Sequence, residues 1–150
     1  MLLKKDLTTS YPRSVYAKLH GVVQLPRAVD KGIATAAGTP GEYNFDCPMD
    51  RGVFGFLGVD AAALLETIKK AQSESEIEAY LKPFVDAKSA DEIAHFNEQF
   101  LAGKPQPGTH GAEYFLELRN QAAPDRSDVT TWADLLDLDE KRPVPQRVAV

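Results

Sequence analysis

The sequence predicts a mainly α-helical protein: a compact single-domain bundle of about six or seven short helices, with at most a short β-hairpin in its N-terminal third. Apolar residues recur at helical spacing along most of the chain, start signals precede these runs, and only one stretch alternates like a strand. With 150 residues, of which 43% are hydrophobic, the chain has the size and composition of one globular domain. We expect this domain to span residues 1–150, with residues 1–10 and 141–150 as frayed tails.

The clearest predicted helix covers residues 25–36, where apolar side chains follow the spacing of one helix face. Pro26 suits the first turn of this helix, and Gly38 suits the position just past its end. Three charged residues lie on the opposite face: Arg27, Asp30 and Lys31.

Residues 42–47 are the only convincing strand-like stretch, because Tyr43, Phe45 and Cys47 alternate with polar residues. Its one candidate pairing partner is the segment 15–23. We therefore expect at most a short hairpin here and no large sheet.

Six further helices are predicted. Five of them have a start signal, which is a proline, an N-cap residue or a capping box, at Pro48, Asp60, Ser73, Ser89 and Thr131. The sixth covers residues 114–122 and ends before Pro124.

Charge and cysteine content narrow the setting of the protein. A net charge of −5 and a pI near 5.2 oppose nucleic-acid binding, which depends on cationic surfaces. The single cysteine excludes an internal disulfide framework, and no stretch is apolar for long enough to cross a bilayer. We predict a cytoplasmic protein with neither nucleic-acid nor membrane partners.

The charge is uneven, since residues 1–31 contain six basic and two acidic residues and so have a net charge of +4. Such a stretch packs against acidic parts of the same chain or forms a local anion site, and both interpretations are open.

Three blocks of the chain resemble a bacterial family catalogued as a domain of unknown function, number 5069. The central block runs from Leu25-Pro26-Arg27 through Gly41-Glu42-Tyr43 to Phe54-x-Phe56-x-Gly58-x-Asp60. The outer blocks are Asp6-Leu7-Thr8 with Pro12-Arg13-Ser14, and Thr130-Thr131-Trp132 with the acidic run that follows. The resemblance implies a cytosolic, single-domain protein and supplies no catalytic or ligand residues.

The candidate ligand-binding residues are Arg13, Arg27, Lys31 and Glu42. Arg27 and Lys31 share a helix face, where a guanidinium and an ammonium could hold one small anion while Asp30 orients them. The alternative is a structural ion-pair network that ties this helix to residues 42–50.

The candidate catalytic residues are Asp30, Asp46 and Asp50. Carboxylates so spaced could hold Mg²⁺ through waters or divide the roles of general acid and base. The alternative is that the acids near the predicted helix start only stabilise the helix dipole. The three histidines are scattered, so we expect no dedicated metal site.

Cys47 and Trp132 are the remaining candidates. Cys47 lies near a predicted helix start, which favours a reactive thiol, but its place in the alternating stretch favours a core position. Trp132 is expected to anchor the core, and the acidic run after it could dock a basic partner or the chain's own basic N-terminal stretch.

We therefore predict a non-catalytic helical domain that binds a small anionic molecule or a protein partner through the segment with Arg13, Arg27 and Lys31. The alternative is a small enzyme that uses its paired carboxylates on a phosphorylated or carboxylated metabolite. The enzyme requires acids and bases that converge on a pocket, whereas a binding domain requires only an accessible charged surface.

Overall fold

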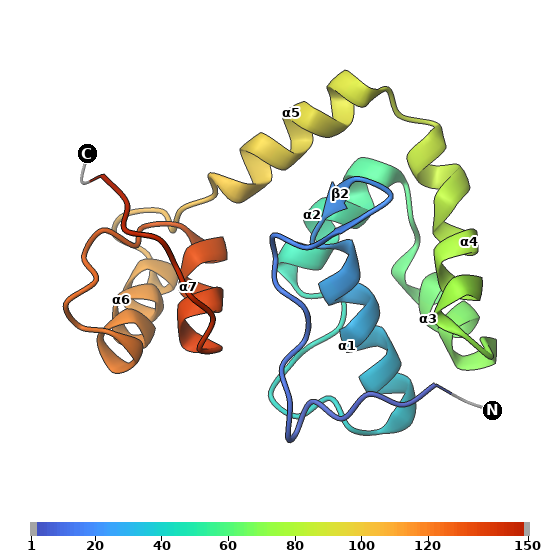
Figure 1. Ribbon diagram of the computed structural model, residues 1–150, viewed down its shortest axis with the longest axis horizontal. Coiled ribbons are helices and arrows are strands. Elements are labelled where there is room, and N and C mark those ends of the chain that lie inside the picture. The colour runs from blue at the N-terminus through green and yellow to red at the C-terminus, as the bar shows by residue number, and fades with distance from the viewer. Residues whose placement is uncertain (1–2, 149–150) are drawn as a thin grey trace. The chain divides into compact units, whose positions relative to one another are not determined.

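Seven helices and one two-stranded hairpin form the described part of the chain, residues 3–148, in a computed structural model (Figure 1). The elements are β1 (Lys18–Leu19), β2 (Val22–Val23), α1 (Leu25–Ala37), α2 (Pro48–Leu57), α3 (Ala61–Lys70), α4 (Glu74–Asp86), α5 (Ala90–Leu101), α6 (His110–Ala122) and α7 (Trp132–Asp139). The mainly α fold with a short hairpin in the N-terminal third is thus confirmed.

The helix boundaries follow the local chemistry of the sequence. Gly38 ends α1 in the left-handed conformation (φ 77°), and its amide donates to the carbonyls of the last turn. Ser89 and Glu92 at the start of α5 exchange two hydrogen bonds, with the Ser89 amide donating to the Glu92 carboxylate and the Glu92 amide donating to the Ser89 hydroxyl. Thr131 caps α7 by accepting from the Asp134 amide.

The hairpin is made by residues 18–23 alone. Lys18 pairs with Val23 and Leu19 pairs with Val22 in antiparallel register. The two residues between the strands, His20 (φ 51°) and Gly21 (φ 83°), both have positive φ, as the tight hairpin turn requires.

Residues 42–47, predicted as a strand, form turns instead. The positive φ angles of Gly41 (58°) and Asp46 (63°) break the extended backbone at both ends of this segment. Its alternate side chains still reach α1: the guanidinium of Arg27 lies 5.5 Å from the ring centre of Tyr43. The alternation in the sequence therefore reflected contacts with α1, and the strand assignment was wrong.

The chain divides into two compact units, Met1–Asn97 and Glu98–Val150, and the prediction of a single domain stays a prediction. In the first unit α1 contacts β1, α2 and α3, and α3 contacts α4. Their apolar faces form one core, in which Leu25, Leu64, Ile77 and Leu81 are completely buried.

The second unit is built on α6 packed against α7. Phe115, Val129 and Leu135 form its buried core, and Trp132 meets Phe115 edge-on with ring centres 5.1 Å apart. Arg126 donates to the carbonyls of Val144 and Pro145, so the last described residues are held against this unit without forming a helix or strand.

None of the helices within residues 3–148 is both long enough and apolar enough to cross a membrane.

Candidate functional site

Asp30 of α1 is the centre of the first of two buried charge clusters in the first unit. Its side chain is completely buried. One oxygen accepts from the Arg13 backbone amide (2.8 Å) and from Arg13 Nε (3.1 Å), and the other accepts from Arg13 Nη2 (2.9 Å). Lys5 Nζ adds a second cation at 3.4 Å. Two cations therefore neutralise one buried carboxylate.

Arg13 is held by this cluster in its charged form. Partial burial disfavours the guanidinium, but the hydrogen bond and charge of Asp30, together with the charge of Glu74, outweigh that effect and raise the pKa of Arg13. Glu74 Oε1 lies 3.4 Å from Arg13 Nη2. Arg13 thus links residue 30 of α1 to the first turn of α4.

Asp50, in the first turn of α2, is the centre of the second buried cluster. Its carboxylate, which is also completely buried, lies 2.8 Å from Lys31 Nζ. It also accepts from Gln24 Nε2 (2.9 Å) and from the backbone amide of Asp46 (3.0 Å). Lys31 Nζ lies 3.2 Å from Cys47 Sγ. These contacts fasten α1 to the turn segment and to the start of α2.

The predicted site residues are therefore brought together only in part. Arg13, Asp30, Lys31 and Asp50 join the two clusters, where each carboxylate is paired with a cation of the chain. Arg27 is buried, and its Nη1 donates to the carbonyl of Arg13.

Of the other predicted residues, Glu42 lies outside both clusters, while Asp46 and Cys47 contact the second one through the Asp46 backbone amide and the Cys47 sulfur. Glu42 is exposed and makes no ion pair or side-chain hydrogen bond with the described residues. The Asp46 carboxylate lies 3.6 Å from Arg51 Nε at the surface. Cys47 is half-buried at the start of α2.

Metal-binding geometry is not present in the described residues. No group of three or more His, Cys, Asp or Glu side chains between residues 3 and 148 is arranged to hold a metal ion. The oxygens of Asp30 and Asp50 face cations and amides of the chain itself.

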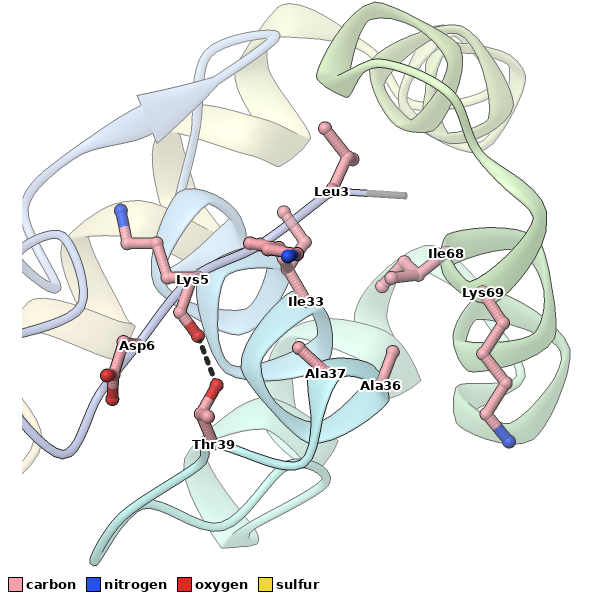
Figure 2. A pocket seen from close by; sticks show the side chains of 10 residues that line it. Leu3, Lys5, Asp6, Ile33, Ala36, Ala37, Thr39, Ile68 and Lys69 are labelled. Atoms are coloured by element: carbon pink, nitrogen blue, oxygen red, sulfur yellow. Dashed lines mark hydrogen bonds between the residues drawn. The ribbon is translucent and has the colours of Figure 1, made fainter. Parts of the chain in front are cut away.

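A hollow of about 550 Å³ lies next to the first cluster. It is bordered by the N-terminal segment of residues 3–8, here called the strap, by the last turn of α1 and by the last turn of α3 (Figure 2). Its apolar lining consists of Leu3, Ile33, Ala36, Ala37 and Ile68. Its polar lining consists of Lys4, Lys5, Asp6, Thr39 and Lys69.

The strap is fixed to the end of α1 by backbone and side-chain contacts. The Leu7 amide donates to the Thr39 carbonyl (3.0 Å), and the Thr39 hydroxyl donates to the Lys5 carbonyl (2.7 Å), as Figure 2 shows for the second bond. Gly41 makes room for the strap, because a Cβ there would lie 2.5 Å from the Leu7 carbonyl oxygen. These contacts hold the strap in a defined position, where it forms one wall of the hollow.

The charges around the hollow differ in how far they are compensated. Lys5 lies beside Asp30, and Lys69 Nζ lies 3.2 Å from Glu66. The side chain of Lys4 has no ion-pair or hydrogen-bond partner among residues 3–148. Hydrogen bonds from the Thr8 hydroxyl and amide lower the pKa of Asp6, so this carboxylate is ionised but turned to Thr8.

None of Arg13, Arg27, Lys31 and Glu42 lines the hollow, and neither do the three candidate acids. Sequence reasoning counted Lys4 and Lys5 only toward the net charge of the first 31 residues. The available signal was the run Leu3-Lys4-Lys5, which places two cations next to an apolar residue.

The family model described as "Domain of unknown function (DUF5069)" matches residues 9–142, and the chain belongs to this family. The match includes the α1 and α3 walls of the hollow, while residues 3–6 precede it. No curated protein matches the chain.

Proposed function

We propose that this member of the DUF5069 family is a non-catalytic domain that binds a small organic anion in the hollow between the strap, α1 and α3. The observation that supports the proposal is the pairing of an apolar floor with lysines at the edge. Binding sites for small molecules have this composition, because apolar walls supply affinity and a few charged groups fix orientation.

The two buried clusters support a role as scaffold for this site. Asp30 and Asp50 are neutralised by Arg13 and Lys31, so a ligand could reach those cations only by leaving a buried carboxylate unpaired. Lys4, in contrast, is exposed and uncompensated by the described residues. An anion at Lys4 gains a partner without breaking an internal ion pair.

The position of α1 explains why the hollow would keep its shape. Lys31 and Asp50 fasten this helix to α2, and Arg13 fastens it toward α4. A site carried by a helix that is held on several sides retains its geometry better than one carried by free loops. The clusters therefore contribute to binding through the rigidity of the hollow.

We also propose that the protein is cytoplasmic and has no nucleic-acid partner. A single, half-buried thiol fits a reducing cytoplasm, and the net charge of −5 fits a small-molecule ligand better than a nucleic acid.

A thermal-shift experiment tests this function. The purified protein is heated with phosphate, citrate, acetate, benzoate or octanoate, and the same anions are tested with Lys4→Gln and with the control Lys82→Gln. Lys82 is an exposed lysine of α4 that lies 3.2 Å from Asp86 and does not line the hollow.

We expect at least one anion, at about ten times its Kd, to raise the melting temperature by about 3–6 °C. The shift should persist in Lys82→Gln and fall in Lys4→Gln. If no anion raises the melting temperature, or if both variants respond alike, the proposal is wrong and a protein partner becomes the better hypothesis.

A further inference from the structure

We infer, on the basis of the proposed function, that the ligand is an amphipathic monocarboxylate: a single negative head on an apolar body. The structure assigns the head to Lys4 and the apolar body to the floor, which is formed by Ala36 and Ala37 over the buried Ile33 and Ile68. A hollow that binds an anion of another class would still fulfil the proposed function.

The charge balance favours one negative charge on the ligand. The three lysines around the hollow, Lys4, Lys5 and Lys69, are matched in number by the acids Asp6, Asp30 and Glu66. Lys5 pairs with Asp30 and Lys69 with Glu66, so Lys4 is the lysine of the three with no acid partner among the described residues. The hollow also lies at the C-terminal ends of α1 and α3, where the helix dipole is negative. A dianion or trianion would therefore meet more negative than positive potential beyond its first contact.

The shape and composition of the floor favour an apolar body. Ile33 and Ile68 are each only 2% exposed and close the bottom of the hollow as part of the core of the first unit, so the apolar surface that a ligand could cover comes mainly from Leu3, Ala36 and Ala37. Ala36 and Ala37 are exposed, and their short side chains leave the space that the hollow occupies. A compact anion such as phosphate would leave this apolar surface in contact with water.

The length of the apolar body should then set the affinity. Each methylene that moves from water onto the floor should increase affinity by about three- to fourfold until the hollow is filled. A cavity of about 550 Å³ lies within the size range of sites that enclose small organic ligands. Affinity should therefore rise along a series of straight-chain carboxylates.

Two-dimensional NMR titration of the full chain tests the inference. The main probes are the straight-chain carboxylates acetate, butanoate, hexanoate and octanoate, each below its micelle-forming concentration. Octan-1-ol is the neutral analogue of octanoate. Octyl phosphate, phosphate and citrate are the more highly charged anions. The amide signals of Ile33, Ala36 and Ile68 report on the floor, and the fitted shifts give each Kd.

Two variants with matched controls localise the site. Lys4→Gln removes the head partner and is compared with Lys82→Gln. Ala36→Leu fills the floor and is compared with Ala62→Leu, which adds the same side chain at an exposed position of α3 outside the hollow. All four positions are exposed, so each variant is expected to fold.

Support would consist of affinity that increases from butanoate to octanoate and is about fivefold weaker for octan-1-ol or in Lys4→Gln. Ala36→Leu should abolish the floor shifts, and neither control should do so.

If phosphate or citrate binds as tightly as octanoate in a Lys4-dependent manner, the inference is overturned and the proposed function stands. If octan-1-ol binds as tightly as octanoate, the role of Lys4 is wrong. If no anion shifts the floor signals, both proposals fail.

Discussion

The Lys31–Asp50 ion pair gives the sharpest test of how the first unit is held together. The perturbation is Lys31→Met, which keeps the apolar stem of the side chain and removes the ammonium. In the native protein Lys31 Nζ lies 2.8 Å from the carboxylate, and the two side chains are 4% and 0% exposed. The variant leaves Asp50 with two donors, Gln24 Nε2 and the amide of Asp46, and no cation.

The expected loss of unfolding free energy is about 3–5 kcal/mol, the usual cost of leaving one member of a buried ion pair without its partner. This is a large fraction of the roughly 5–15 kcal/mol that stabilises a typical domain. The matched control is Lys82→Met, because Lys82 and Asp86 form a similar pair at 3.2 Å with 60% and 59% exposure. We expect that control to cost less than about 1 kcal/mol.

The assay is urea unfolding followed by circular dichroism, in which a lower midpoint with an unchanged slope reports lost stability. The double variant Lys31→Met/Asp50→Asn removes both charges and should lose less than the sum of the two single variants, by about 0.5–3 kcal/mol. If Lys31→Met costs no more than Lys82→Met, the pair is not desolvated in solution, and the argument from burial is refuted.

The other predictions concern packing, capping and pH. Gly32→Ala should cost about 1–3 kcal/mol in urea unfolding, because its Cβ would lie 2.6 Å from an α3 side chain, whereas Gly55→Ala, with no atom within 4 Å, should be neutral or stabilising by up to about 1 kcal/mol. Equal effects at the two glycines would contradict the packing described for α1. Ser89→Ala should cost about 1 kcal/mol and Ser73→Ala much less, since only the first hydroxyl accepts a capping hydrogen bond, and a reversed order would contradict this. Hydrogen bonds from the Arg126 side chain and the Arg147 amide lower the pKa of Asp128, so its ionised form stabilises the fold above the unfolded pKa of about 3.9 and this contribution is lost as the pH falls below it. The difference in melting temperature between the wild type and Asp128→Asn should therefore shrink as the pH falls from about 5 to about 2, and a constant difference would contradict the assignment.

The helices could be predicted because each has a local cause in the sequence. Gly38 ends α1 and Ser89 with Glu92 begins α5 as expected, since caps depend on residues within one turn of each other. The prediction of a strand over residues 42–47 was wrong because apolar and polar residues can also alternate in a segment of turns, here one in which Gly41 and Asp46 have positive φ. Asp46 does so without being glycine: aspartate tolerates this conformation but does not require it, so the residue type alone could not predict the turn.

The candidate site was predictable only as a set of charges. The helical spacing placed Arg27, Asp30 and Lys31 on one face, but it could not show that this face would be buried. That burial depends on contacts between residues 17 to 26 positions apart along the chain, such as Arg13 with Asp30 and Gln24 with Asp50. The hollow is formed by segments that are even farther apart in the sequence, residues 3–6 and the end of α3.

The strap also has a practical consequence for ligand screening. Leu3, Lys4 and Lys5 supply one wall of the hollow, so a purification tag fused close to Leu3 would lie next to that wall. Charged or histidine-rich tags placed there would change the local electrostatic potential and compete for the same space. A C-terminal tag, or complete removal of an N-terminal one, is therefore the appropriate form of the protein for every binding experiment described above.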